Sequence, residues 1–411
     1  MKLADAQAMD AADELAYKRA GFVLPAEVIY LDGNSLGALP KIAQVRAQQV
    51  VESEWGQDLI SSWNSHDWIN LPVTLGEKIA RLLGADAGQT LCCDSTSINL
   101  FKLLHCALAM QQGRTVVLTQ TDNFPADLYI AQGLSNGIGA TGCSIKSVEA
   151  AEIEQHLQTD VAVLLLTHVH YKHAAMHDMK RLTRLAHAQG ILVIWDLAHS
   201  AGALPLALDE CEVDFAVGCG YKYLNGGPGA PAFLYAATRH HSSIQNPLTG
   251  WMGHNTPFDF SSQYEPAAGI RQFLCGTPSI IAMSVLDAAL DVFADVDMQT
   301  LRRKSLALMD LFLQLVSANP ALQDLQLESP SNSEQRGSHL AFAHPDAYAI
   351  CQALIDHNVI CDFRAPTTLR LGFAPLYIRF EDVWNAVAVL TNVMQSKLYQ
   401  AEKYTKRLQV T

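Results

Sequence analysis

The sequence lacks several features that would assign it to a particular class of protein. Its longest apolar runs, such as residues 161–166, are far shorter than the roughly 20 residues of a membrane-spanning helix. Positive charge is scarce: 28 Lys and Arg face 41 Asp and Glu, the net charge is −13, and no basic cluster offers a site for a phosphate backbone. Internal repeats and low-complexity tracts are missing too. We therefore expect no membrane span and no nucleic-acid partner, and a small molecule as substrate.

The amino terminus and the cysteines indicate the compartment. Residues 1–5 reach an acid, Asp5, before any apolar stretch forms, so we expect no signal peptide. The nine cysteines are an odd number and include no C-x-x-C pair. In a long chain without a secretory signal, such a set favours reduced, mostly buried thiols over disulfides or structural zinc. We expect a soluble, cytoplasmic protein.

Short β-rich runs alternate with helical stretches between about residues 90 and 280. This alternation implies parallel pairing and right-handed crossovers, so the predicted fold class is α/β, with a three-layer large domain around a mostly parallel sheet. Ligands in such folds bind at the carboxyl ends of the strands. The pattern predicts strands at 115–119, 161–167, 191–195 and 213–217, and helices at 126–134 and 178–189.

The pattern changes after Pro278 and indicates a second, smaller α+β domain. The polar stretch 329–334 is interpreted as a surface loop within it. We divide the chain into an N-terminal segment (1–60) that contributes to the small domain and to dimer contacts, a large cofactor-binding domain (61–285) and a small domain (286–411). Helices are expected at 279–296, 298–318, 345–357 and 380–395, and strands at 338–343 and 358–363.

Lys222 is the strongest single signal. It lies between an apolar run and a glycine-rich turn, and Asp196 follows the preceding apolar run, 191–195. Burial lowers the pKa of an amine and makes it a nucleophile toward carbonyl groups. Either residue alone would be interpreted as a turn residue or a cap, but together they meet the needs of pyridoxal phosphate: a lysine for its aldehyde and a carboxylate for its ring nitrogen. We predict a pyridoxal phosphate enzyme.

That cofactor also needs an anion site. Ser95, Thr96 and Ser97 precede an apolar helical run, and the free N–H groups of a helix N-terminus bind phosphate. The alternative is that one of the three simply caps the helix. The sequence does not choose between these interpretations.

Three further residues have a functional and a structural interpretation. Phe124 is placed to stack on the pyridine ring and Asp127 to contact the cofactor, or the two form a helix staple and cap. His199, three residues after Asp196, either reaches the phosphate, orients that carboxylate or is an interior hydrogen-bonded histidine.

Four histidines, at 168, 170, 173 and 177, fall close together. Metal binding requires ligands that converge, whereas these straddle a strand end, a loop and a helix start. We predict polar residues near the active site and no metal.

Seven segments together resemble the motifs of the kynureninase family, whose members are fold-type I pyridoxal phosphate enzymes similar to class V aminotransferases. The resemblance spans nearly the whole chain. The motifs Leu-Asp-Gly-Asn-Ser-Leu-Gly and Gly-Trp-Met-Gly-His are the most specific, because several others are shared across fold type I. The segments are 30–37, 123–127, 196–202, 220–229, 250–254, 276–278 and 369–377.

The resemblance implies a homodimer with active sites at the subunit interface. It implies hydrolysis of the Cβ–Cγ bond of L-kynurenine, or of its 3-hydroxy analogue, to anthranilate or 3-hydroxyanthranilate and L-alanine. This reaction serves tryptophan degradation and the synthesis of NAD precursors. The sequence does not rank the two substrates or the two pathways.

The resemblance also implies roles for individual residues. Lys222, Tyr221 and Asp196 are catalytic: Lys222 binds the aldehyde and moves the Cα proton, Tyr221 protonates Cβ, and Asp196 binds the ring nitrogen. Trp251, Gly276 and Thr277 complete the site from the partner subunit, Gly276 being assigned to the substrate. Arg370 clamps the substrate carboxylate, and Ser35 and Trp63 belong to the substrate site, with interface packing as the alternative for Trp63. The remaining cofactor contacts are Thr96, Ser97, Phe124, Asp127, Thr167 and His199.

One loop departs from the family pattern. Where the family has Tyr-x-Thr-Gly after a polar residue, this chain has His170-Tyr-Lys-His-Ala174. Because the loop borders the cofactor, this departure bears on substrate preference more than on cofactor identity.

Two rival functions remain. A cysteine desulfurase or an epimerase has the same fold, but a desulfurase needs a mobile cysteine shortly before the carboxylate-binding arginine, where this chain has Pro366-Thr-Thr368. The second rival is a non-catalytic protein that retains the fold. The joint presence of Asp196, Tyr221, Lys222 and Arg370 favours an enzyme.

Overall fold

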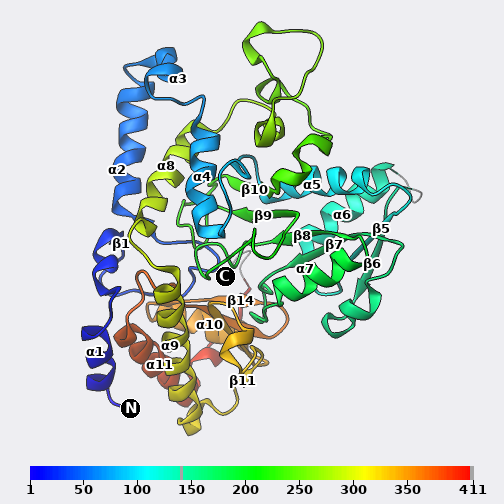
Figure 1. Ribbon diagram of the computed structural model, residues 1–411. Helices are drawn as coiled ribbons and strands as arrows, with labels where there is room; N and C mark the ends of the chain where they lie inside the picture. The colour runs from blue at the N-terminus through cyan, green and yellow to red at the C-terminus, as the bar shows by residue number, and fades with distance from the viewer. Residues whose placement is uncertain (139–141, 408–411) are drawn as a thin grey trace.

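A seven-stranded sheet forms the centre of the molecule (Figure 1). The computed structural model describes residues 1–138 and 142–407. The strand order is β4-β10-β9-β8-β7-β5-β6. The five strands from β9 to β6 pair in parallel, and β10 is antiparallel to both β9 and β4. The bounds are β4 (Thr90–Cys92), β5 (Val116–Gln120), β6 (Ser144–Val148), β7 (Val161–Thr167), β8 (Leu192–Asp196), β9 (Phe215–Cys219) and β10 (Ala232–Ala236).

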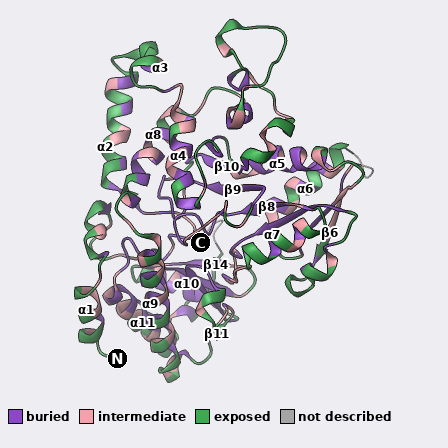
Figure 2. Ribbon diagram, viewed as in Figure 1, coloured by how far each residue is buried: buried purple, intermediate pink, exposed green. Residues whose placement is uncertain are grey.

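Two helical layers cover this sheet, because its central strands are apolar on both faces. All seven residues of β7 are buried, as expected for parallel strands that lie between two layers. Helices α4 (Leu71–Leu83), α7 (Met179–Ala188) and α8 (Ile280–Leu290) share one hydrophobic cluster, and α5 (Thr96–Met110) and α6 (Pro125–Ile138) share the other. Figure 2 shows the buried strands between helices with exposed outer faces. The predicted three-layer α/β fold is confirmed.

The expected strands and helices of this domain are present, within two residues at most ends. Asp196 is the last residue of β8 rather than the residue after it, and β9 begins at Phe215 instead of residue 213. The register pairs Thr167 with Asp196 at the carboxyl ends of β7 and β8. The strands β4, β6 and β10 were not predicted. Strand β6, Ser-Ile-Lys-Ser-Val, is only partly buried, so its sequence has no apolar run.

A smaller antiparallel sheet follows, in the order β11-β12-β15-β14.

Two predictions for this part of the chain are wrong in extent. The single helix expected at 279–296 is shorter, because α8 ends at Leu290 and a 3₁₀ turn follows. The single strand expected at 358–363 is also wrong: β13 pairs with the N-terminal segment and β14 with β15. The elements are β11 (Gln326–Leu327), β12 (His339–Ala343), β13 (Val359–Ile360), β14 (Asp362–Arg364) and β15 (Thr368–Gly372), with α9 (Met298–Ser317), α10 (Ala347–Asp356), α11 (Phe380–Gln395) and α12 (Glu402–Thr405).

The N-terminal segment lies against this smaller sheet and its helices. Strand β2 (Ile29–Tyr30) pairs in parallel with β13. The carboxylate of Asp10 accepts hydrogen bonds from the main-chain N–H groups of Phe380 (2.7 Å) and Glu381 (2.9 Å). A residue near the start of the chain therefore caps the first turn of α11, a helix near the end of the chain. The other elements are α1 (Leu3–Ala11), β1 (Phe22–Val23), which pairs with β3 (Leu39–Pro40), α2 (Lys41–Gln49) and α3 (Ser62–Ser65).

The helices and cysteines bear on the compartment that the sequence predicts. In residues 1–138 and 142–407, no helix has the length and apolarity needed to cross a membrane. All nine cysteines are free thiols, and seven of them are buried.

The cap on α11 predicts a measurable loss of stability. Asp10→Ala removes both hydrogen bonds to the first turn of α11, so we expect the free energy of unfolding to fall by about 1 to 2 kcal/mol. Asp10→Asn, which keeps one acceptor oxygen, should lose less. Urea unfolding followed by circular dichroism measures the change, with Asp160→Ala at an exposed turn as the control. Equal stability of Asp10→Ala and the control would show that Asp10 does not hold α11.

Candidate active site

One small cavity at the carboxyl ends of β7 and β8 collects nine of the predicted cofactor residues. They come from the starts of α5 and α6, the ends of the two strands, and the loops after β8 and β9. Segments far apart in the sequence therefore converge on one place. The nine are Thr96, Ser97, Phe124, Asp127, Thr167, Asp196, His199, Tyr221 and Lys222.

Lys222 lines this cavity, and the residue is 8% exposed. Its Nζ atom is 3.4 Å from Nε2 of His199 and 5.8 Å from the ring centre of Phe124. Burial is the main cause that lowers the pKa of Lys222, and the positive charges of Arg370 and Arg364 lower it further, against the attraction of Asp196. With a lowered pKa, a larger share of the amine is in the neutral, nucleophilic form at a given pH.

Asp196 and Asp127 form a buried pair of carboxyl groups beside that amine. Burial raises the pKa of both, and the charge of Asp196 raises that of Asp127 further, whereas Lys222 favours ionised Asp196. The proton of the pair therefore rests on Asp127, which shares a contact of 3.4 Å with Oγ1 of Thr167. Asp196 remains the anion, and its Oδ1 accepts the main-chain N–H of Ala198 at 2.7 Å. A buried, oriented carboxylate is the group that a pyridinium nitrogen requires.

At the start of α5, one residue caps the helix and the next two line the cavity. Ser95 is the N-cap, and its hydroxyl accepts the N–H of Ile98 at 3.4 Å. Thr96 and Ser97 are the next two residues and line the cavity. Because Ser95 already caps the helix, these two hydroxyls and the helix dipole are available to an anion.

The rings of Phe124 and Tyr221 both lie near the amine, with their centres 5.8 and 5.9 Å from Nζ of Lys222. Phe124 is 36% exposed, meets Tyr171 edge-on at 5.2 Å and begins the turn before α6. The nearby thiol of Cys219 and burial raise the pKa of Tyr221, so this phenol keeps its proton at neutral pH. His199 is buried, and its pKa is held well below the usual range by burial and by the charge of Lys222.

These residues fit pyridoxal phosphate. A nucleophilic amine and a buried carboxylate line the same cavity as two hydroxyls at a helix N-terminus. The amine has only one polar contact within the described residues, the 3.4 Å approach of His199, so it is free to react. Lys222 would hold the aldehyde, Asp196 the ring nitrogen, and Thr96 and Ser97 the phosphate.

Arg370 and Ser35 lie together in a neighbouring polar cluster. Strands β14 and β15 place Asp362 opposite Arg370, and the carboxylate of Asp362 accepts from Nε of Arg370 at 2.8 Å. Nη2 of Arg370 donates to Oγ of Ser35 at 2.9 Å, and Nη1 donates to the carbonyl of Tyr171. Tyr171 links this cluster to the cavity, because its ring contacts Phe124.

Besides Arg370 and Ser35, four predicted site residues lie outside the cavity of this single chain. Trp251 is 39% exposed and packs on Phe258 and Phe260. Gly276 and Thr277 line a separate recess with Cys93 and Asp94. Trp63 packs edge-on against Trp68 of the same chain, with ring centres 5.9 Å apart.

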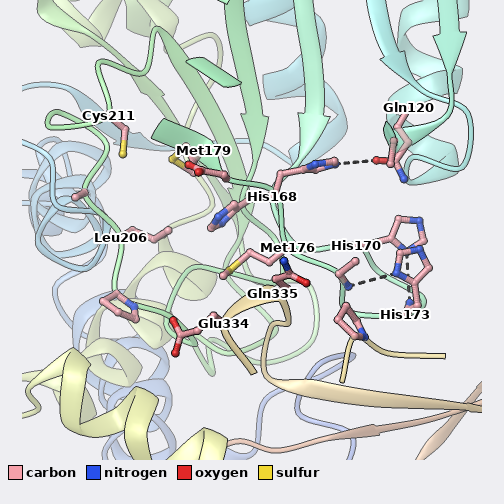
Figure 3. Close-up of a pocket in the computed structure, with 17 residues that line it drawn as sticks. Gln120, His168, His170, His173, Met176, Met179, Leu206, Cys211, Glu334 and Gln335 are labelled. Carbon is pink, nitrogen blue, oxygen red and sulfur yellow. Dashed lines mark hydrogen bonds between the residues drawn. The ribbon is translucent and has the colours of Figure 1, made fainter. Parts of the chain in front are cut away.

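The four clustered histidines border a second cavity of about 710 Å³, shown in Figure 3. His170 and His173 stack in parallel, with ring centres 3.6 Å apart, and their Nε2 atoms face the carboxylate of Asp122 at 3.3 and 3.6 Å. Their Nδ1 atoms accept main-chain N–H groups, so the ring protons lie on Nε2. One ligand atom from each of His170, His173 and Asp122 lies within 4.8 Å of the others, so these three groups converge closely enough to hold a metal ion. The arrangement is a hydrogen-bonded clamp on Asp122.

The loop that departs from the family pattern holds this clamp. Ala174 adopts φ +63°, a left-handed conformation that glycine adopts without strain. The carbonyl oxygen of Tyr171, in the same loop, accepts a hydrogen bond from Arg370. The departure therefore changes the side chains around the carbonyl that positions Arg370.

Sequence reasoning missed the acidic partners of Arg370. Asp362 is 2% exposed. Burial raises the pKa of its carboxyl group, but the hydrogen bonds and charge of Arg370 lower it more, to about 2. Asp32 lies beside it, and burial and the charge of Asp362 raise the pKa of Asp32 to about 8. The alternation Asp-Phe-Arg at 362–364 was a usable signal, because alternate residues of a strand share a face.

Comparisons with known proteins agree with this geometry. Residues 301–390 match the family model described as the kynureninase C-terminal domain. The chain is 48% identical to the kynureninase of Pseudomonas fluorescens and 47% identical to that of Burkholderia pseudomallei (strain 1106a), with 99% of both chains covered in each case.

Solved structures resemble the fold at much lower identity. The apo cysteine desulfurase of Thermococcus onnurineus NA1 matches with a TM-score of 0.79 and 18% identity, over 92% of this chain and 98% of that chain. A mutant of C-DES, described with glycine covalently linked to its PLP cofactor, matches with a TM-score of 0.78 and 18% identity, over 91% of this chain and 99% of that chain. These likenesses show the fold, whereas the identity of nearly half over the full length shows that the chain belongs to the kynureninase family.

Proposed function

We propose that this protein hydrolyses the Cβ–Cγ bond of L-kynurenine to anthranilate and L-alanine with pyridoxal phosphate as its cofactor. The observation that carries the proposal is the convergence of Lys222, Asp196, Thr96 and Ser97 on one cavity, in a chain of the kynureninase family. When bound, the cofactor would withdraw electrons through Cα. It would thereby stabilise the negative charge that cleavage of the Cβ–Cγ bond leaves on Cβ.

Lys222 is the residue that moves protons at Cα. Its amine is buried and its pKa is lowered, so a larger share of the amine is neutral and able to accept a proton from Cα. Asp196 keeps its negative charge through Lys222 and the N–H of Ala198. Asp127, which carries the proton of the pair, keeps that charge oriented.

Tyr221 is the proton donor that completes L-alanine. Bond cleavage leaves negative charge on Cβ after water has added to the ketone, and that carbon needs a proton. The raised pKa of Tyr221 keeps the phenol protonated, and the ring centre lies 5.9 Å from Nζ of Lys222. Tyr221 is therefore a protonated acid within reach of the reacting carbons.

The desulfurase alternative is not favoured. Desulfurases use a mobile, reactive cysteine, whereas Cys361 is 1% exposed and contacts Cys351 at 3.8 Å. The contact with Cys351 and burial raise the pKa of Cys361 well above its ordinary value, which makes the thiol unreactive.

We further propose that the active unit is a homodimer with shared active sites. Trp251, Gly276 and Thr277 would then serve the cavity of the partner. An apolar groove supports this proposal, because large apolar side chains rarely stay in water without a partner surface. The groove is lined by Leu39, Val50, Trp55, Trp68, Pro228, Pro278, Ile280, Ile281 and Val285.

The domain division stays a proposal: 1–60 as an N-terminal segment, 61–285 as the large domain and 286–411 as the small one. The pairing of β2 with β13 and the cap that Asp10 places on α11 support the link between the first and last parts. We also propose a cytoplasmic location, in keeping with nine free thiols.

Incubation with L-kynurenine tests the activity directly. The protein should release fluorescent anthranilate and L-alanine, and a parallel assay with 3-hydroxykynurenine ranks the two substrates. Lys222→Ala should reduce turnover by at least about 1,000-fold and lose the visible absorbance of the covalently held cofactor. Lys180→Ala, at an exposed position on α7, is the control. Full activity of Lys222→Ala would refute the assignment.

Mixing inactive variants tests the shared active site. Lys222→Ala and a Trp251→Ala/Thr277→Val double variant should each be nearly inactive, but random exchange of subunits should restore about one quarter of wild-type activity, because half the dimers then hold one intact site. Lys222→Ala mixed with Asp196→Asn is the control and should restore nothing, since both residues belong to the same chain's cavity. Restoration in both mixtures, or in neither, would contradict the sharing.

A further inference from the structure

Asp122, His170 and His173 form a cluster of metal-ligating side chains that the proposed reaction does not use. Oδ2 of Asp122 is 3.3 Å from Nε2 of His170 and 3.6 Å from Nε2 of His173. Two ligands that each bind a tetrahedral ion at about 2.1 Å are about 3.4 Å apart, so these separations are those of ligands around one metal ion. Among the residues that the structure describes, no other group of three His, Cys, Asp or Glu side chains converges in this way.

The donor atoms of the cluster favour a particular class of metal. Two imidazole nitrogens and one carboxylate oxygen suit divalent first-row transition metals such as Zn²⁺, whereas Ca²⁺ and Mg²⁺ prefer oxygen ligands. Three protein ligands leave a fourth position of a tetrahedral ion for water. The cluster therefore has the ligand types and the number of ligands of an open zinc site.

The three side chains differ in their access to solvent. The side chain of Asp122 is 54% exposed and that of His173 is 28% exposed, whereas that of His170 is 5% exposed. The two rings lie one against the other at the edge of the second cavity (Figure 3). An ion can therefore reach the cluster from solvent, with His170 as its inner ligand.

Folding creates the cluster from two neighbouring strands. Asp122 lies two residues after the end of β5, and His170 lies three residues after the end of β7. These strands pair in parallel, so their carboxyl ends meet at one edge of the sheet. The sequence predicted no metal because its four histidines straddle different elements. Only two of them converge, and the third ligand comes from 48 residues before His170.

A bound ion would replace hydrogen bonds that now hold the cluster. Nε2 of His170 lies 2.8 Å from the carbonyl oxygen of Asp122, and the Nδ1 atoms of both rings accept main-chain N–H groups at 3.2 to 3.4 Å. Coordination through Nε2 moves the proton of each ring to Nδ1, so these contacts are lost. The Nδ1 contacts are long for hydrogen bonds, which limits the cost.

The stack of the two rings sets a second cost. Parallel rings with centres 3.6 Å apart direct their Nε2 lone pairs side by side, so one ring must rotate for both to face the ion. His173 is the more exposed ring and has the room to do so. These costs make the site weaker than a closed structural zinc site, and its ion exchanges with solution.

We propose that Asp122, His170 and His173 bind one exchangeable divalent transition-metal ion, for which Zn²⁺ is the best match, and that this ion ties together two loops beside the cofactor cavity. Phe124, two residues after Asp122, lines that cavity. Tyr171, which follows His170, meets the ring of Phe124 at 5.2 Å. The proposal does not rest on the proposed function, because it requires neither substrate nor turnover.

Titration of the cofactor-loaded protein with ZnCl₂, free of unbound cofactor and followed by calorimetry, tests the site. The wild-type protein should bind one Zn²⁺ per chain. His173→Thr, which introduces the residue of the family pattern, and Asp122→Asn, which keeps the shape of the side chain, should each weaken binding by at least about 100-fold. Even the loss of an outer partner of a metal ligand costs about 10- to 100-fold.

A histidine outside the cluster provides the control. His357→Gln, at an exposed position after α10, should bind Zn²⁺ as the wild-type protein does. The proposal would be overturned by the absence of saturable binding to the wild-type protein, or by equal affinities of the wild-type protein, His173→Thr and Asp122→Asn.

Crystals grown with ZnCl₂ locate the ion. An anomalous difference map should place a peak about 2.0 to 2.2 Å from the three ligand atoms. A peak at the thiol of Cys211, which lines the same cavity, with none at the cluster would contradict the assignment.

Hydrogen exchange followed by mass spectrometry tests the tie between the loops. Zn²⁺ should slow the exchange of the main-chain amides of residues 121–124 in the wild-type protein, because opening of this loop then requires release of a ligand. The same addition should leave the exchange of His173→Thr unchanged. If Zn²⁺ binds to the wild-type protein without slowing this exchange, the ion does not tie the loops.

Discussion

The removal of the Lys222 amine from water is the constraint on which the site depends. A buried ammonium is costly unless a counter-charge lies nearby. Asp196 supplies that charge from the end of the neighbouring strand, and Asp127 takes the proton that would otherwise neutralise it. The parallel part of the sheet is what brings these groups together, because its five parallel strands all end at one edge. Moving any of these strand ends would leave a buried charge without its partner.

The same logic holds the polar cluster around Arg370 together. Arg370 and Arg364 repel each other, and the buried carboxylate of Asp362 offsets that repulsion because it accepts hydrogen bonds from Arg370 and forms an ion pair with Arg364. The hairpin of β14 and β15 fixes this triad through its register. The electrostatics of this cluster and of the cavity are therefore linked, because the positive charges of Arg370 and Arg364 lower the pKa of Lys222 and favour its neutral amine.

The sequence predicted the architecture well wherever local pattern and burial coincide. Uninterrupted apolar runs indicated β5, β7, β8 and β9, and the ends of those strands indicated Asp196 and Thr167. The residues of the cofactor cavity could be predicted as well, because each of them lies in a local motif.

Strands β6 and β15 were missed, since their burial or pairing depends on distant partners rather than on their own composition. The polar network around Arg370 was missed for the same reason: Asp32, Asp362 and Arg364 meet only after β2, β13 and β14 have assembled. The place of Trp251, Gly276 and Thr277 in a site would depend on a second subunit, which neither periodicity nor motif spacing describes.

The cap that Asp10 places on α11 has a consequence for the order of events during synthesis. A ribosome releases the first residues of the chain long before residues 380 and 381 exist, so α1 and β2 have no native partner for most of translation. Until then, the apolar side chains of this leading segment are exposed to solvent and to other nascent chains. The contacts of α1 with α11 and of β2 with β13 must therefore wait for the end of the message, while the seven-stranded sheet is free to form earlier.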